Sequence, residues 1–258
     1  MSYIFLDYIK FLLASTNKHG VHSPFIFQLV TKAFYKQNSK KKWTQFLTIK
    51  NEYLQDNRVI GVTDFGAGSK VFKSNRRKIG DIARVAGISS KKAAIVLKIV
   101  HYFKPKAILE IGTSIGLGSS TLSIGNPLAK IKTLEGCKET ATIAKEYFKK
   151  NNFENITVDV GDFEQTLPNV IENKKFDFIY FDGNHTKNAT LKYFNNCLSS
   201  IKNNTFWIFD DIYLNSEMQE AWEIIKRRTE VTVTIDLFQF GIVFFRKEQA
   251  KEHFKIRC

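Results

Sequence analysis

The sequence predicts an α/β fold: a seven-stranded sheet, with parallel strands and a terminal antiparallel hairpin, preceded by an N-terminal helical cap. Strand-like and helix-like segments alternate from Lys106 onward, which implies right-handed crossovers and a parallel sheet covered on both faces. Only Gln239, Phe240 and Gly241 separate the last two strand-like segments, so these two form a hairpin. All the excess positive charge lies before residue 105, which sets the cap apart from the sheet.

Seven strand-like segments bounded by turn residues are the predicted strands. They cover residues 107–112, 131–136, 156–161, 176–182, 205–210, 231–238 and 242–246. Five stretches of helical length connect the first six strands, at residues 114–124, 138–151, 163–173, 186–201 and 216–229.

Three segments of the N-terminal part have helical character. Residues 3–14 and 24–35 are amphipathic and rich in Phe, Tyr and Leu, so we expect them to cover the sheet, close over a substrate or form a homodimer contact. Residues 79–100 predict a pair of helices before the first strand. DNA binding is the alternative for this pair, because Gly87 and Ser89 also fit a helix-turn-helix.

Charge divides the chain of 258 residues in two. Residues 1–104 contain 19 Lys and Arg against 5 Asp and Glu, an excess of 14, whereas residues 105–258 contain 20 of each kind. We therefore expect a basic cap at 1–104 and a ligand-binding domain at 105–258.

Residues 40–42 predict a solvated loop. Residues 64–78 predict a flexible basic loop near the mouth of the site, which holds a phosphate, a carboxylate or a nucleic-acid backbone, or is a mobile surface loop.

Composition excludes several classes of protein. Hydrophobic residues make up 43% of the chain and charged residues 25%, which excludes wholesale disorder and a coiled coil. Three cysteines and five histidines show no disulfide or metal-ligand spacing. No run reaches the roughly 18 apolar residues of a membrane span, and the N-terminus lacks the features of a signal peptide. We expect a cytoplasmic protein.

Acidic residues recur where the five parallel strands end. Because parallel sheets bind ligands at the carboxyl ends of their strands, acids on one rim predict a ligand site. The first strand ends in a glycine-rich turn, whose alternative role is helix–strand packing. The rim residues are Glu110, Gly112, Ser114 and Gly116 around this turn, Glu135, Gly161 and Asp162 after the next two strands, and Asp182, Asp210 and Asp211 after the last two.

Residues 109–116, Leu-Glu-Ile-Gly-Thr-Ser-Ile-Gly, resemble motif I of class I S-adenosylmethionine-dependent methyltransferases, in particular the catechol and caffeoyl-CoA O-methyltransferase-like group. The resemblance covers about residues 90–247 and implies a Rossmann-like sheet. It places Glu110 and Gly112 near the methionine end of S-adenosylmethionine, Glu135 at the ribose and Asp162 beside the adenine. Ser114, Gly116, Gly161 and Asp182 complete the expected cofactor site. NAD binding is the competing interpretation, and the terminal hairpin disfavours it.

Asp182, Asp210 and Asp211 form the candidate reacting centre. Neighbouring strands bring these carboxylates together, so a divalent cation or a basic partner must offset their repulsion. The metal-dependent relatives carry Asp and Asp-Asn at these places, and this chain departs from them with Asp-Asp. We expect Mg²⁺ or Mn²⁺ at the three residues. The alternative without metal has Asp210 capping the strand end and Asp211 starting a helix.

His185 stands three residues after Asp182, where the related enzymes carry a lysine that acts as general base. We expect Asp182 and His185 to be catalytic, with His185 taking the proton of a hydroxyl group. A metal-ligand role, or a structural role at a helix start, are the alternatives for His185.

These observations predict an S-adenosylmethionine-dependent methyltransferase that methylates a hydroxyl of a small molecule with metal assistance. One alternative is an RNA methyltransferase that uses the basic N-terminal part. Another is a cofactor-binding or nucleic-acid-binding protein without catalysis.

Overall fold

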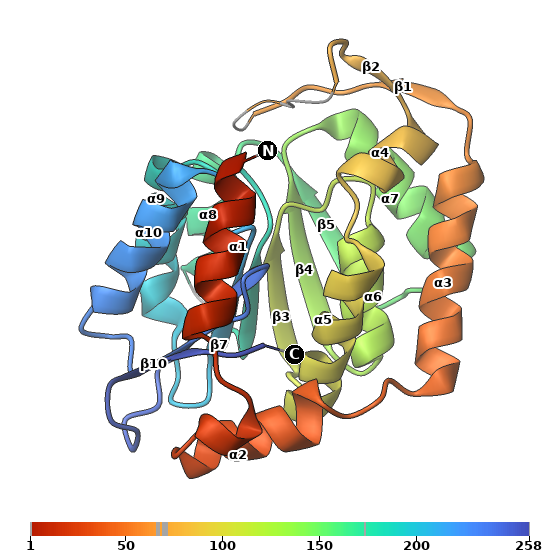
Figure 1. The fold of residues 1–258 in the computed structure, drawn as a ribbon. Coiled ribbons are helices and arrows are strands. Elements are labelled where there is room, and N and C mark those ends of the chain that lie inside the picture. The colour runs from red at the N-terminus through yellow and green to blue at the C-terminus, as the bar shows by residue number, and fades with distance from the viewer. Residues whose placement is uncertain (1, 66–67, 69–71, 173, 258) are drawn as a thin grey trace.

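The computed structural model describes residues 2–65, 68, 72–172 and 174–257. A sheet of eight strands, in the order β10-β8-β9-β7-β6-β3-β4-β5, passes through the molecule with helices on both faces (Figure 1). The five strands β3 to β7 are parallel to one another, as predicted. Their bounds are β3 Ala107–Ile111, β4 Lys130–Glu135, β5 Ile156–Val160, β6 Phe178–Phe181 and β7 Phe206–Asp210.

The terminal hairpin is confirmed, with one difference in its turn. Strand β8, Val233–Asp236, pairs antiparallel with β9, Phe240–Phe244, and β9 also pairs antiparallel with β7. Phe240 and Gly241, predicted in the turn, begin β9 instead, because Phe240 is fully buried and Gly241 pairs with both neighbouring strands. The turn is therefore formed by residues 237–239.

The sheet has one strand more than the predicted seven. Strand β10, Glu252–Lys255, pairs parallel with β8 at the edge of the sheet. The sequence gives little sign of it, because three of its four residues are charged or polar and its side chains are only partly buried. Short, charged edge strands are a common protection against edge-to-edge association.

Two helical layers enclose the sheet (Figure 1). One hydrophobic core joins a face of the sheet to residues 21–53 of the N-terminal part and to α4–α7, and a second core joins the other face to α8–α10. The bounds are α4 Ile79–Val85, α5 Ser90–Phe103, α6 Leu117–Gly125, α7 Lys138–Lys150, α8 Phe163–Ile171, α9 Lys187–Cys197 and α10 Ser216–Arg227, with a short 3₁₀ helix η3 at Leu198–Ser200. The predicted pair of helices at residues 79–100 corresponds to α4 and α5.

The N-terminal segment contains the predicted helices and one that was not predicted. Helix α1 spans Ser2–Ala14, a 3₁₀ turn η1 spans Lys18–Gly20, and α2, Pro24–Leu29, continues as a π-helical turn η2, Val30–Phe34. Helix α3, Lys40–Gln55, begins with the lysine run, so the predicted loop at residues 40–42 is wrong. Buried Phe46, Ile49 and Tyr53 anchor this helix to the core and offset the unfavourable lysine run. A hairpin of β1, Val59–Gly61, and β2, Arg76–Lys78, follows.

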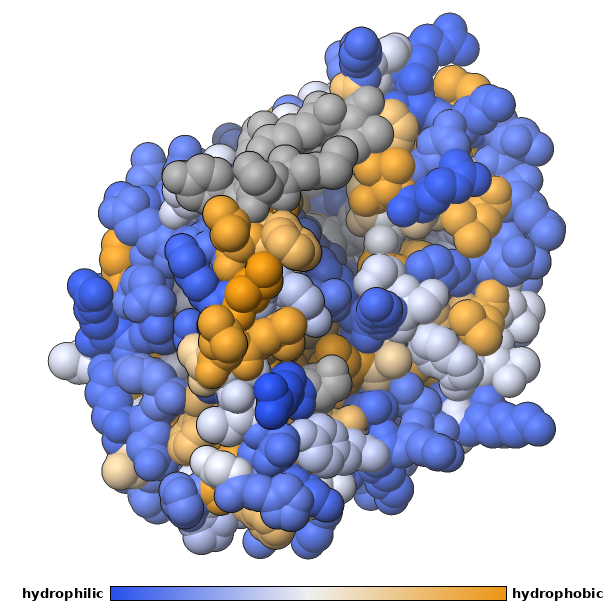
Figure 2. All heavy atoms as spheres, viewed as in Figure 1, coloured by the Kyte–Doolittle hydropathy of each residue, from blue (hydrophilic) through white to orange (hydrophobic). Residues whose placement is uncertain are grey.

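The N-terminal helices cover part of the sheet, but α1 leaves an apolar face in solvent. Ile26, Phe46 and Val100 belong to the same core as the strands. Phe5 and Leu13 of α1 are 64% and 84% exposed, and Figure 2 shows the apolar side chains gathered on this face. No helix in the described ranges is long and apolar enough to cross a membrane. The boundary near residue 104 stays a prediction of domain organisation.

Candidate active site

A cavity of about 680 Å³ lies at the carboxyl ends of the parallel strands. Strand β3 pairs with β4 on one side and with β6 on the other, so the chain order reverses at β3. Such a reversal point opens a crevice outside the strand ends, where open α/β sheets bind ligands. Of the expected site residues, Gly112, Ser114, Glu135, Asp162, Asp182, His185, Asp210 and Asp211 line this cavity.

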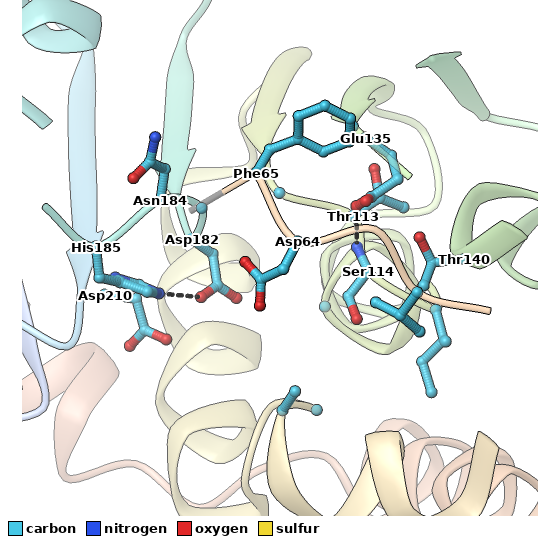
Figure 3. Close-up of a pocket in the computed structure, with 18 of the residues that line it drawn as sticks. Asp64, Phe65, Thr113, Ser114, Glu135, Thr140, Asp182, Asn184, His185 and Asp210 are labelled. Atoms are coloured by element: carbon cyan, nitrogen blue, oxygen red, sulfur yellow. Dashed lines mark hydrogen bonds and ion pairs between the residues drawn. The ribbon is translucent and has the colours of Figure 1, made fainter. Parts of the chain in front are cut away.

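Glu135 ties the end of β4 to the turn after β3. Its Oε2 accepts a 2.6 Å hydrogen bond from the backbone N–H of Ser114, and its Oε1 accepts one of 2.9 Å from the N–H of Cys137 (Figure 3). Burial raises the pKa of the Glu135 carboxyl, and these two donors oppose that rise. The carboxylate is therefore held in place on the cavity wall by backbone donors.

The other residues of the glycine-rich turn have mainly structural contacts. Glu110 is fully buried below the cavity, where its carboxyl accepts hydrogen bonds from Ser119 and, at 2.6 Å, from Thr133. Burial raises the pKa of Glu110 to about 7. Gly116 packs against α7, because a Cβ there would meet the ring of Phe148. The packing alternative for the turn thus applies to Gly116.

Gly112 has a backbone requirement of its own. Its φ is +107°, and a Cβ there would collide with the carbonyl group of Asp182 on the adjoining strand segment. The glycine lets β3 and the end of β6 approach each other at the base of the cavity. Neither Glu110 nor Gly116 nor Gly161 lines the cavity.

Asp162 and the loop between β1 and β2 form another part of the wall. Asp162 caps the start of α8, and its Oδ1 accepts a 2.9 Å hydrogen bond from the N–H of Glu164. Phe65 lies beside Glu135 in Figure 3. Arg77 of β2 also lines the cavity, with its guanidinium 4.7 Å from the centre of the Phe72 ring and 3.8 Å from Asp64 Oδ2. Residues 66, 67 and 69–71 of the predicted basic loop lie outside the described residues.

The acidic cluster, Asp182, Asp210 and Asp211, forms where β6 and β7 end side by side, as predicted. The sequence did not reveal which basic group faces it. Lys92 of α5 places its Nζ 2.7 Å from Asp210 Oδ1 and 2.6 Å from Asp211 Oδ1. The Lys92 side chain is only 14% exposed, and it also lines the cavity. Of the two expected ways to offset the repulsion, the structure contains the basic partner.

The titration of the cluster is strongly perturbed. Burial and then the charge of Asp210 raise the pKa of Asp182 well above its usual range, and burial raises the pKa of Asp210, against Lys92. Burial lowers the pKa of Lys92, but the charges of Asp210, Asp211 and Asp182 outweigh it and raise the pKa overall. Lys92 therefore stays protonated.

The cluster does not fit a divalent ion in this arrangement. An ion such as Mg²⁺ or Mn²⁺ needs several free oxygen ligands, and the Lys92 ammonium lies within hydrogen-bond distance of the oxygens that would supply them. Across residues 2–65, 68, 72–172 and 174–257, no group of three His, Cys, Asp or Glu side chains is arranged to hold a metal ion.

His185 lines the cavity beside the acidic cluster. Its Nε2 is 3.7 Å from Asp182 Oδ1, and both side chains are 22% exposed (Figure 3). His185 precedes α9, whose N-cap is Thr186. Three non-glycine residues that follow strand ends adopt a left-handed backbone conformation: φ is +50° at Ser114, +50° at Asn184 and +53° at Asp211. Such conformations are costly and cluster at functional sites.

Comparison with known proteins agrees with this fold. Residues 109–212 match a family model described as a methyltransferase domain. The SAH-bound methyltransferase PaMTH1 of Podospora anserina superposes with a TM-score of 0.60 at 15% identity, over 83% of this chain and 92% of that one. The O-methyltransferase TomG of Streptomyces achromogenes, involved in tomaymycin synthesis and solved with SAM, gives 0.57 at 15% identity, over 83% and 93%.

An O-methyltransferase of Bacillus cereus in complex with SAH gives a TM-score of 0.53 at 18% identity, over 85% of this chain and 97% of that one. None of the curated proteins matches this chain. The sheet with its terminal hairpin and the matched domain confirm the predicted resemblance to class I methyltransferases. The chain thus has the class I methyltransferase fold, and residues 109–212 are similar to a methyltransferase domain.

Proposed function

We propose that the protein transfers the methyl group of S-adenosylmethionine to a hydroxyl of a small molecule. The observation that carries the proposal is the cavity at the reversal point of the sheet, which has a fixed carboxylate on one wall and a histidine beside an acidic cluster on another. Its volume of about 680 Å³ lies within the usual range of small-molecule sites, roughly 300–1,000 Å³.

The residues near β3, β4 and β5 fit the cofactor. Glu135 would accept hydrogen bonds from the ribose hydroxyls, because it lines the cavity and each carboxylate oxygen can accept more than one hydrogen bond. Asp162 would lie beside the adenine, and Gly112 and Ser114 near the methionine end. When bound, S-adenosylmethionine supplies an electrophilic methyl group, so the protein needs only to align and deprotonate the acceptor.

The acceptor enters beside His185. His185 takes the hydroxyl proton at its Nδ1, and the acidic cluster facing Nε2 stabilises the imidazolium that forms. The buried charges in the wall of this cavity favour a small acceptor over a polymer, because only a group that projects from its molecule enters the cavity and reaches them. Mg²⁺ or Mn²⁺ at Asp182, Asp210 and Asp211 does not fit with Lys92 in place, so no step of this proposal uses a metal ion.

RNA is the second candidate acceptor, and the uneven charge of the chain favours it. The excess of 14 positive charges in residues 1–104 would attract phosphates, and Arg77 brings one of these charges to the cavity. A homodimer formed through the exposed face of α1 is compatible with either acceptor.

Two experiments test the proposal. Calorimetric titration measures binding of S-adenosylmethionine, and an activity assay then measures transfer of a labelled methyl group to phenols, catechols, aliphatic alcohols and total RNA. We expect micromolar cofactor binding and label in a small hydroxylated compound. Label in RNA that disappears with rising salt would favour the second candidate. Lack of cofactor binding would contradict both.

A further inference from the structure

The position of Lys92 is set by the start of helix α5. Ser89 caps this helix by accepting a hydrogen bond from the backbone N–H of Lys92 at 3.2 Å, which places Lys92 in the first turn. Helical side chains lean toward the N-terminus of their helix, and the start of α5, with Gly87, Ile88 and Ser89, lines the cavity. The capped helix start therefore directs the lysine at the strand ends of β6 and β7.

Lys92 forms close ion pairs with two carboxylates of the acidic cluster. Its Nζ lies 2.7 Å from Oδ1 and 2.8 Å from Oδ2 of Asp210, and 2.6 Å from Oδ1 of Asp211. The side chains of Asp210 and Lys92 are 5% and 14% exposed, so water screens the contact between them weakly, whereas Asp211 is 36% exposed and more open to solvent. The ring of Phe240, with its centre 5.8 Å from Nζ, covers the ammonium group on another side.

We propose that the Lys92 ammonium group is the built-in cation of this active site, in the place of a divalent metal ion. Lys92 is a positioning residue: it holds Asp210 and Asp211 at the cavity wall and offsets the repulsion that would otherwise require a metal. The catalytic role of Lys92 in this inference rests on the proposed function. Whether the acidic cluster binds a metal ion can be measured independently of that function. It follows that the wild-type chain does not take up Mn²⁺ at the cluster, whereas removal of the ammonium group opens a metal site there.

Titration of purified full-length wild type, Lys92→Met and Lys91→Met with Mn²⁺ tests the inference. Lys91 is the matched control, because it is an exposed lysine of the same helix turn that does not line the cavity. The amount of bound Mn²⁺ is read by electron paramagnetic resonance, and the shift in melting temperature by calorimetry. We expect Lys92→Met to bind one equivalent of Mn²⁺ and to regain thermal stability with it, while wild type and Lys91→Met bind none at the cluster.

A second substitution locates the metal. Lys92→Met combined with Asp210→Asn should lose the acquired Mn²⁺. The inference is overturned if wild type binds an equivalent of Mn²⁺ that Asp210→Asn abolishes, or if folded Lys92→Met binds none. The wild-type titration decides even where Lys92→Met fails to fold. None of these measurements needs turnover, so a failed search for the methyl acceptor leaves this result intact, and the absence of S-adenosylmethionine binding would refute the proposed function alone.

Discussion

The carboxylate of Glu135 and the backbone N–H of Ser114 are joined by a 2.6 Å hydrogen bond across the carboxyl ends of β4 and β3. Ser114 has a φ of +50°, a conformation that few non-glycine residues adopt. The hydrogen bond to Glu135 helps to hold the turn in this conformation. The carboxylate that would bind the cofactor ribose thus also shapes the turn that would lie beneath the cofactor.

Substitution of Glu135 should therefore weaken cofactor binding. We expect Glu135→Ala to reduce the affinity for S-adenosylmethionine by about 1–3 kcal/mol, because charge-assisted hydrogen bonds to the ribose are lost. Calorimetric titration measures this directly. Glu139→Ala is the matched control, because Glu139 is an exposed glutamate at the start of the following helix and does not line the cavity. Unchanged affinity in Glu135→Ala would remove this residue from the site.

The buried carboxyl of Glu110 should make stability depend on pH. Burial raises its pKa to about 7 in the folded protein, whereas the unfolded chain has the ordinary value of about 4.3. The folded state therefore holds the proton more tightly than the unfolded state. The contribution of this group to the free energy of unfolding is fully present below about pH 4 and is lost as pH rises through 7. We expect wild type to lose about 4 kcal/mol of unfolding free energy between these limits through this group.

Glu110→Gln should remove this dependence. Glutamine retains an oxygen that can accept the hydrogen bonds of Ser119 and Thr133 and carries no titrating proton. Urea unfolding at pH 5.5 and pH 8 should show a smaller difference between the two pH values in the variant than in wild type. Identical pH profiles would show that Glu110 does not titrate in this interval.

Much of the sheet was predictable, since each parallel strand ends in a turn, most of these strands are rich in apolar residues, and both hairpin strands are buried. The exceptions have physical reasons. Helix α3 begins with three lysines, and its apolar contacts become visible only once the sheet is in place. Strand β10 consists mainly of charged and polar residues and is stabilised by pairing with β8.

The site was predictable only where its residues follow strands. Asp182 and Asp210 follow neighbouring parallel strands, so topology alone brings them together. Lys92 lies 118 residues before Asp210, on a helix whose side chain directions depend on its tertiary packing. A lysine at a helix start is common in any sequence, so its residue type carried no signal. The buried position of Glu110 was also hidden, because it depends on Ser119 and Thr133 on other elements.

Gly112 should tolerate no side chain. Gly112→Ala would place a Cβ against the carbonyl group of Asp182 and force alanine to a φ of +107°, which costs about 1–3 kcal/mol for the backbone conformation alone. Gly61→Ala is the control, because a Cβ at Gly61 meets nothing within 4 Å. Thermal unfolding should show a marked loss of stability for Gly112→Ala and little change for Gly61→Ala. Equal melting temperatures would mean that the strand ends can separate without cost.

His185 should affect the chemical step and leave cofactor binding intact. The imidazole lies 3.7 Å from Asp182, away from Glu135 and the turn after β3, so His185→Ala removes the proposed base without touching the cofactor wall. We expect the turnover rate to fall by about 10²–10⁴-fold, the usual contribution of a positioned general base, with S-adenosylmethionine affinity within about twofold of wild type. Single-turnover transfer of a labelled methyl group, beside calorimetric titration of the cofactor, separates the two effects. The rate of His185→Ala should also rise with pH, because the acceptor must then lose its proton to solvent. A variant with wild-type turnover would leave the acceptor to be activated by another group of the cavity, and equal losses of rate and of cofactor affinity would indicate a structural role for His185.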